Sequence, residues 1–427
     1  MGFGIAVTIG NAIGAGILRA PGEVAGHLPV DWLYMAVWAL GGLYAFLGAL
    51  QLAELGAMIP RSGGQYVFSR YALGEYPGFI VGWSDWISTC GTTAAVSLVV
   101  GEFAVALFPT LTGRVTVIAT AVTVVFAATQ WRGIRWGSVV QDVTSALKAL
   151  AFVALAGSAL VIGVQSTSPD AVTPPAGFTL VAAFVLSLQA VIYTYDGWSA
   201  TIYFSEEVEN PGRDIPRSLI GGVLAVIAIY LFVNVSLLMV LRVSGLAGEP
   251  FAAGALAGVL FGAWGDPVFR VLVIVSMLSA INSNHLMASR VLFAMSRDGL
   301  FTARAAVVNE GGTPTMSLLA SAAVAIVFIV FGRTFDRVIT VLAFFFVANY
   351  TLSFTSVFVL RRREPDKARP YRAWGYPWTT ALALLGSIGF LAGAIASDTA
   401  NSVVALLVLV ASYPVFRLTR SFWYRSA

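Results

Sequence analysis

The sequence predicts an all-α polytopic membrane protein with 12 transmembrane helices. Of its 427 residues, 58% are hydrophobic and only 11% are charged, whereas a soluble globular domain carries roughly 25% charged residues. The mean hydropathy is +0.84. Apolar stretches long enough to cross a bilayer core recur along the chain. They are expected to be helices, because unpaired backbone groups cannot face lipid.

The predicted spans use most of the chain and leave room for short connections only. In order they are residues 3–25, 32–58, 77–107, 115–130, 136–164, 178–205, 216–241, 267–289, 314–332, 336–360, 378–397 and 400–418. One further apolar stretch, Phe251 to Trp264, is rich in Gly and Ala. It is too short for a span, so we expect a re-entrant or surface helix there.

Basic residues predict the orientation. If residues 251–264 do not span and the N-terminus is cytoplasmic, eighteen of the 25 Lys and Arg residues fall on the inner side, six on the outer side, and Lys148 inside a span. Because cytoplasmic loops carry an excess of Lys and Arg, we expect a multi-pass protein of the cell membrane with both termini cytoplasmic. This bias also explains the net charge of +4 without a nucleic-acid partner.

Two spans carry residues that interrupt a helix at mid-depth. The first contains Gly10-Asn11-Ala12-Ile13-Gly14-Ala15-Gly16, and the sixth contains Tyr193-Thr194-Tyr195-Asp196-Gly197-Trp198. Glycine costs about 1 kcal/mol in a helix interior, and a charge at the bilayer centre costs about 2.5–3.5 kcal/mol. Broken helices at matching places in two halves indicate a secondary transporter built from inverted repeats. For the first span alone, a packing face of small residues is the alternative.

The two breaks predict an amino acid site. The N–H groups that begin the second half of a broken helix lack partners and carry the positive end of the helix dipole, so they bind a carboxylate. Gly14 and Gly16 would let the ligand approach the backbone closely. The carbonyls that end the first half of the sixth span suit an ammonium group. Together these groups would hold both ends of an α-amino acid.

Three side chains near the breaks have candidate roles. Asp196 could be a counter-ion for a cationic substrate, a proton carrier or a cap on the broken helix. Lys148 lies about 18 Å from the cytoplasmic end of its span, too deep to snorkel easily. We expect its ammonium to bond carbonyls of the unwound first span, where a sodium-coupled carrier would hold Na⁺. The Tyr193 ring could close over a substrate or pack against a neighbouring helix.

Several motifs carry a family resemblance. They are Gly10 to Leu18 (with Ala15 where Ser is usual and Leu18 where Phe is usual), Ala53 to Gly64, Trp131-Arg132-Gly133 with Gln141, Thr144 and Lys148, Tyr195 to Trp198, Glu206 to Arg217, Ser289-Arg290 to Arg297-Asp298-Gly299, and Arg369-Pro370-Tyr371-Arg372. This set resembles the amino acid–polyamine–organocation superfamily, closest to its L-type amino acid transporter branch and bacterial relatives.

The resemblance implies a leucine-transporter-type fold. Residues 1–164 would form the first five-helix repeat, residues 165–361 the inverted second repeat, and residues 362–427 two extra helices and a C-terminal tail. Access would alternate about a site between spans 1 and 6, with spans 3, 8 and 10 contributing. A side-chain pocket lined by small residues of spans 3, 6, 8 and 10 could admit either small or large apolar amino acids.

The resemblance also implies the site residues. The substrate carboxylate would meet backbone at Gly14, Ala15 and Gly16, and the amino group would meet carbonyls at Ala12, Tyr193 and Asp196, beside Gly197. Lys148 would replace a coupling sodium. The predicted gate residues are Tyr193, Glu206, Glu207 and Arg213.

The predicted function is therefore amino acid transport by sodium-independent exchange or proton-coupled uptake. A polyamine or organic amine carrier and a sodium-coupled symporter are the alternatives. The first would need more acidic residues than Asp196 alone, and Lys148 argues against the second. An enzyme is not expected, because no HExxH, GxSxG or Walker motif occurs. No cofactor is expected either.

Two departures from the family pattern concern partners and the chain start. The single cysteine, Cys90, excludes an intrachain disulfide. Residues 108–114, where animal relatives carry the cysteine that links a glycoprotein subunit, contain none, so no disulfide-linked partner is expected. The oligomeric state cannot be read. Almost nothing precedes the first span, which leaves open whether the N-terminus is truncated.

Overall fold

The computed structural model describes residues 2–28, 30–132, 137–162, 179–332 and 334–426. Helices make up nearly all of this part of the chain, and apart from a lone bridge between Val308 and Pro314 it contains no β-structure. The all-α prediction is confirmed. Gly133 lies outside the described residues, as do the side chains of Gln141 and Thr144 and the proposed repeat boundary at 164/165.

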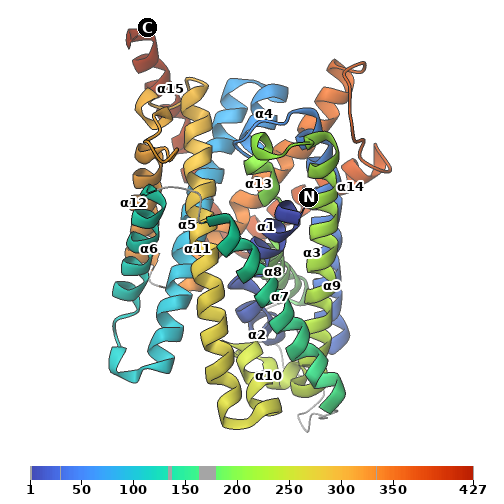
Figure 1. The fold of residues 1–427 in the computed structure, drawn as a ribbon. Coiled ribbons are helices and arrows are strands. Elements are labelled where there is room, and N and C mark those ends of the chain that lie inside the picture. Colours follow the sequence, from blue (N-terminus) through green and yellow to red (C-terminus); the bar gives the residue numbers. More distant parts are fainter. Residues whose placement is uncertain (1, 29, 133–136, 163–178, 333, 427) are drawn as a thin grey trace.

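The helices follow the predicted spans in order (Figure 1). They are α1 (Gly2–Ala12), α2 (Gly16–His27), α3 (Asp31–Met58), α4 (Gln65–Leu73), α5 (Glu75–Leu107), α6 (Val115–Trp131), α7 (Gly137–Ile162), α8 (Leu180–Tyr195), α9 (Pro211–Leu246), α10 (Ala252–Phe261), α11 (Gly265–Arg297), α12 (Thr315–Gly332), α13 (Phe335–Arg363), α14 (Trp378–Ser397) and α15 (Thr399–Ser426). Short 3₁₀ helices are η1 (Pro109–Leu111), η2 (Ala200–Glu207), η3 (Gly262–Trp264) and η4 (Ala303–Ala306).

Nine helical segments of the described chain are long and apolar enough to cross a membrane by themselves. α6 and part of α7 (Ala146–Ile162) are shorter apolar helices, and α1 with α2 together cover the first predicted span. This accounts for all 12 predicted spans. α10, in the stretch predicted not to span, has only 10 residues, about 15 Å of helix.

One helix was not predicted. α4 has 9 residues and carries Arg70 in its last turn, so its sequence lacks the long apolar run that marks a span. It lies near the top of Figure 1, and α10 lies near the bottom. We call these two ends of the bundle the α4 end and the α10 end.

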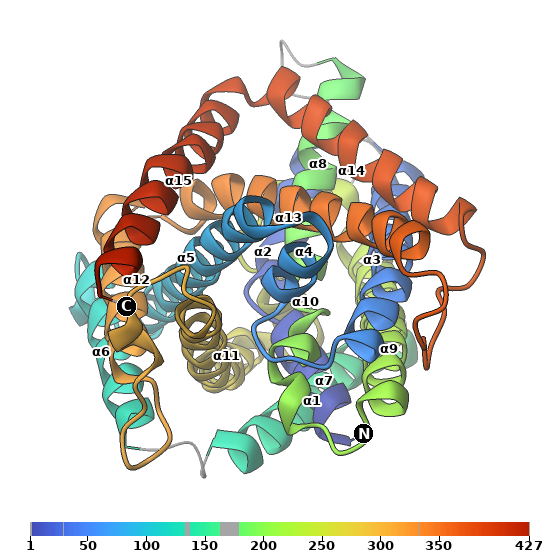
Figure 2. The same ribbon diagram turned by 90° about the horizontal axis from the view of Figure 1, so that it is seen from above.

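One group of helices packs around α5. α5 packs against α4, α6, α11, α12 and α13, and α3 packs along α9. α14 and α15 run along the outer edge, and α2 lies near the middle (Figure 2). α2, the second half of the first predicted span, is thus enclosed by other helices.

Both predicted helix breaks are confirmed. The first separates α1 from α2 at residues 13–15, and the second separates α8 from η2 at residues 196–199. Gly197 has a φ of +100°, a conformation that glycine adopts at no steric cost. A Cβ on Gly197 would lie 2.9 Å from the carbonyl carbon of Asn11, so the two breaks touch.

Two of the family-like motifs meet in a buried ion-pair cluster between α3 and α13. Glu54 accepts hydrogen bonds from Arg361 at 2.6 and 2.7 Å and from the Ala373 N–H at 2.7 Å. Arg369 lies 3.3 Å from the same carboxylate. Glu54 is 2% exposed, and breaking such a buried pair is costly. These motifs therefore hold the helices together rather than lining the site.

Candidate functional site

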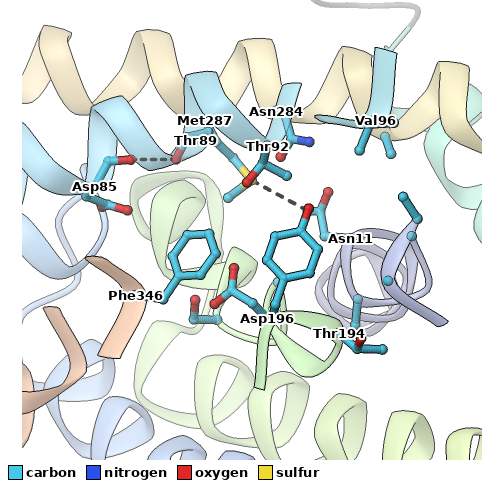
Figure 3. A pocket seen from close by; sticks show the side chains of 18 of the residues that line it. Asn11, Asp85, Thr89, Thr92, Val96, Thr194, Asp196, Asn284, Met287 and Phe346 are labelled. Atoms are coloured by element: carbon cyan, nitrogen blue, oxygen red, sulfur yellow. Dashed lines mark hydrogen bonds between the residues drawn. The ribbon is translucent and has the colours of Figure 1, made fainter. Parts of the chain in front are cut away.

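A central cavity opens where the two helix breaks meet. It has an empty volume of about 690 Å³ including its mouth. All seven residues predicted to bind substrate line it: Ala12, Gly14, Ala15, Gly16, Tyr193, Asp196 and Gly197. α5, α11 and α13 complete the wall, chiefly through Asp85, Thr89, Thr92, Asn284, Met287, Phe346 and Tyr350 (Figure 3). The structure thus brings the two breaks together at one cavity.

The first break presents free backbone donors to this cavity. The Gly14 N–H donates to the Ala12 carbonyl at 2.7 Å, so it is already engaged. Within the described residues, the N–H groups of Ala15 and Gly16 donate to no acceptor. They begin α2, where the helix dipole adds positive potential. Two of the three predicted carboxylate donors are therefore available, and Gly14 is not.

The carbonyl side of the site differs from the prediction. The Ala12 carbonyl already accepts from Gly14 and, at 2.5 Å, from the Tyr230 hydroxyl of α9. A carbonyl oxygen has two lone pairs, so Ala12 has no capacity left for an ammonium group. The same Tyr230 hydroxyl lies 3.0 Å from the Thr194 carbonyl. Tyr230 therefore ties α1 to α8.

Asp196 sits at the end of α8, where its N–H bonds to the Ile192 carbonyl at 3.0 Å. Its carboxylate oxygen Oδ1 accepts from the Tyr350 hydroxyl of α13 at 2.5 Å. The side chain therefore reaches across the cavity wall to another helix, and Figure 3 shows it beside Phe346.

Two further acceptors in the cavity wall have no donor among the described residues. Asn11 donates through Nδ2 to the Met287 sulfur at 3.5 Å, and its buried Oδ1 accepts nothing. Asp85 of α5 accepts from the Tyr203 hydroxyl at 2.6 Å through Oδ1, and its buried Oδ2 accepts nothing. A buried acceptor without a donor costs free energy, so both atoms are suited to a ligand that brings donors.

Lys148 lies beside the first break, where its Nζ donates to the Gly10 carbonyl at 2.5 Å. In an unbroken helix, the Gly10 carbonyl would accept from the Gly14 N–H, which bonds to Ala12 instead. The ammonium therefore satisfies a carbonyl that the break exposes. Lys148 is only 4% exposed.

Toward the α10 end, aromatic rings close the cavity. Tyr193 packs edge-on against Phe335, with ring centres 5.8 Å apart, and stacks on Phe346 at 6.2 Å. Arg19 of α2 lies over the Phe335 ring and pairs with Glu102 of α5. Tyr193 also lines a second cavity, so it contributes to the walls of two spaces.

Toward the α4 end, ion pairs join η2 to α11. Glu206 pairs with Arg297 at 2.9 Å, and Glu207 pairs with Arg290. Below them Asp298 accepts from Arg61 and Tyr66, both at 3.0 Å. Burial raises the pKa of the Tyr66 hydroxyl, so it remains a donor. η2, α4 and α11 are therefore joined here.

Arg213 does not belong to this cluster. It bonds to its neighbour Asp214 at 2.9 Å, and its side chain is 60% exposed. Of the predicted gate residues, Tyr193 lines the central cavity, Glu206 and Glu207 line a separate cavity, and Arg213 lines neither of the two.

Sequence reasoning missed Asp85 and the Arg19–Glu102 pair. Asp85 is a charged residue within the apolar stretch 77–107, and such a residue is a functional candidate by its cost alone. That signal was available. The partners Tyr203, Tyr230 and Tyr350 had no sequence signal, because aromatic residues are common throughout this chain.

Comparisons with known proteins agree over nearly the whole chain. A family model described as amino acid permease matches residues 5–422. The chain is 29% identical over 420 residues to the serine/threonine exchanger SteT of Bacillus subtilis (strain 168), covering 97% of this chain and 94% of that protein.

Two human proteins match a large part of the chain. The b(0,+)-type amino acid transporter 1 of Homo sapiens is 28% identical over 380 residues, covering 86% of this chain and 77% of that protein. The Asc-type amino acid transporter 1 of Homo sapiens is 26% identical over 381 residues, covering 86% and 72%.

Proposed function

Because the chain belongs to the amino acid permease family, we propose that it moves amino acids across the cell membrane by alternating access, as a sodium-independent exchanger or a proton-coupled importer. The observation that carries this proposal is the pairing of free donors and free acceptors in one cavity. The Ala15 and Gly16 N–H groups lie at one break, and acceptors gather at the other. A zwitterion has a complementary group for each.

The carboxylate of the substrate would bind the two free N–H groups at the start of α2, because a helix N-terminus stabilises an anion. The amino group would contact Asp196, the Tyr193 carbonyl and the unpaired Oδ1 of Asn11. Ala12, Gly14 and Gly197 would shape the cavity without bonding the substrate. This assignment uses Asn11 in place of the Ala12 carbonyl.

Independence from sodium is supported by Lys148. Its ammonium bonds the Gly10 carbonyl, so a positive charge already sits at the exposed end of α1. A monovalent cation there would meet like-charge repulsion. Exchangers among the relatives, such as the serine/threonine exchanger of Bacillus subtilis, make exchange the first mode to test.

Alternating access would open one closure at a time. Tyr193, Phe335 and the Arg19–Glu102 pair would form the closure at the α10 end, and Glu206 and Glu207 with their arginines the closure at the α4 end. Two inverted repeats, residues 1–164 and 165–361, would rock about the breaks. The excess of basic residues would place the α4 end and both termini in the cytoplasm.

An organic amine carrier is the second candidate, because Asp85 adds a second acid to the cavity beside Asp196. Such a substrate has no carboxylate, so it would leave the Ala15 and Gly16 N–H groups without a partner. The amino acid is therefore preferred. No disulfide-linked subunit is expected, since Cys90 is buried.

Uptake of labelled amino acids and diamines into proteoliposomes tests the proposal. Uptake that needs an internal amino acid and ignores sodium would identify exchange, and uptake driven by an inward proton gradient would identify proton coupling. Liposomes without protein are the control. A requirement for sodium, or uptake of diamines but of no amino acid, would contradict the proposal.

A further inference from the structure

Asp85 is a buried residue of the cavity that would contact neither the α-carboxylate nor the α-amino group of a bound amino acid. It is 2% exposed and lines the cavity. The Tyr203 hydroxyl bonds Oδ1, and Oδ2 has no donor among the described residues. The cavity therefore contains a carboxylate oxygen that can carry negative charge and can accept a hydrogen bond from a ligand.

The charges around the cavity are unbalanced. Among the described residues, its wall includes two acids, Asp85 and Asp196, and no Lys, Arg or His. Lys148 bonds to the Gly10 carbonyl beside the break and does not line this cavity. A buried carboxylate without a positively charged partner costs several kcal/mol. A cationic ligand group removes this cost at the moment it binds.

An amino acid held in this way would point its side chain toward Asp85. The groups proposed to hold the amino acid backbone come from α1–α2 and the end of α8, whereas Asp85 comes from α5 on the opposite wall, next to Thr89 (Figure 3). Thr92 and Asn284 line the cavity farther from Asp85, beside Met287 (Figure 3). This part of the wall is polar, unlike the lining of small residues that the sequence suggested.

We propose that Asp85 binds a protonated amine on the substrate's side chain, so that the transporter selects cationic amino acids over neutral ones of similar size. The inference rests on the proposed transport of amino acids and names the class transported. The ammonium would donate to Oδ2, while Tyr203 holds Oδ1 and fixes the orientation of the carboxylate. Asp196 would remain beside the α-amino group.

The test is exchange in proteoliposomes with labelled ornithine and labelled alanine, comparing wild type with Asp85→Asn, Asp85→Glu and Asp366→Asn. Asp366 is exposed in the loop after α13 and is the matched control. We expect wild type to prefer ornithine. Asp85→Asn should lower the ornithine-to-alanine ratio of kcat/KM roughly tenfold or more, as loss of a charged hydrogen bond predicts. Asp85→Glu should recover part of that ratio, and Asp366→Asn should match wild type.

Two results would overturn this inference while leaving amino acid transport intact. One is a wild-type protein that prefers alanine, and the other is an Asp85→Asn variant in which kcat/KM falls equally for both substrates. Absence of exchange with every amino acid would instead overturn the proposed function, and this inference with it. If Asp85→Asn does not fold, the thermal shift of the wild-type protein decides. Stabilisation by alanine that equals or exceeds that by ornithine would then reject the inference.

Discussion

Lys148 shows how one side chain can compensate for a broken helix. The break leaves the Gly10 carbonyl without its helical donor, and the ammonium supplies one at 2.5 Å. In hydrocarbon surroundings an unsatisfied carbonyl is costly. The bond therefore couples the position of α7 to the end of α1, so movement of either helix would strain the bond or move the other helix.

Replacing Lys148 by Met should lower the rate of amino acid exchange roughly tenfold or more, because the Gly10 carbonyl loses a charged donor. Met keeps much of the volume, so folding should be less affected than by a change to Ala. Initial exchange rates in proteoliposomes, with melting temperatures in detergent, measure both. Lys367→Met, in an exposed loop pair with Glu364, is the control. Full exchange by a folded Lys148→Met protein would remove the proposed role.

At the residue scale, the sequence predicted where the site residues lie better than it predicted their hydrogen bonds. The depth of Lys148 and the location of the breaks follow from hydropathy and glycine content. The engagement of Gly14 and Ala12 does not, because it depends on Tyr230, which lies 218 residues from Ala12. Asp85 could have been identified by its charge. Its hydrogen bond from Tyr203 could not, because that bond depends on how η2 packs in the folded protein.

At the scale of elements, the crossing of α2 and α8 leaves no room for a side chain at Gly16. A Cβ added there would lie 2.7 Å from the Thr194 Cα and 2.8 Å from its Oγ1. The first of these is backbone, which cannot turn away as a side-chain tip can. The distance between the two broken helices is therefore set by the absence of a Cβ.

Gly16→Ala should separate these helices and lower both stability and exchange, at a cost of about 1–3 kcal/mol for overpacking. Gly157→Ala in α7 is the matched control, because a Cβ there meets nothing within 4 Å and Ala favours helix. Melting temperature and exchange rate of the two variants make the comparison. Equal behaviour would mean that the close crossing is unimportant.

Hydropathy predicted the helices that are long and apolar, and it missed α4. That helix has 9 residues and mixes Tyr, Arg and apolar side chains, so neither length nor composition distinguishes it from a loop. Its position depends on tertiary contacts, which include packing against α5 and α13 and the bonds that Arg70 and Tyr66 make with Asp298 after α11.

For the whole molecule, the charge pattern predicts the orientation in the membrane. The loop after α13 and the turn before α12 lie at the α4 end, whereas η1 and α10 lie at the other (Figure 1). If the α4 end is cytoplasmic, reagents that cannot cross the membrane should reach only the second set in intact cells.

Single cysteines introduced in a Cys90→Ser background test this. Asp366→Cys and Thr112→Cys are both at exposed positions. In intact cells Thr112→Cys should react with an impermeant maleimide, and Asp366→Cys should react only after permeabilisation. Cys90→Ser without a second change contains no thiol and is the control. The Cys90 side chain that it replaces is 1% exposed. The reverse pattern would invert the topology.

The second cavity beyond Tyr193 has a consequence for how substrates arrive. Its lining includes two acids, Glu23 of α2 and Asp398 between α14 and α15, together with His27. Clefts lined by one sign of charge concentrate ions of the opposite sign and speed their capture, most strongly in dilute salt. Cations would thus be enriched in this second cavity before the Tyr193 ring moves. Raising the ionic strength would slow the entry of cations more than the entry of uncharged solutes.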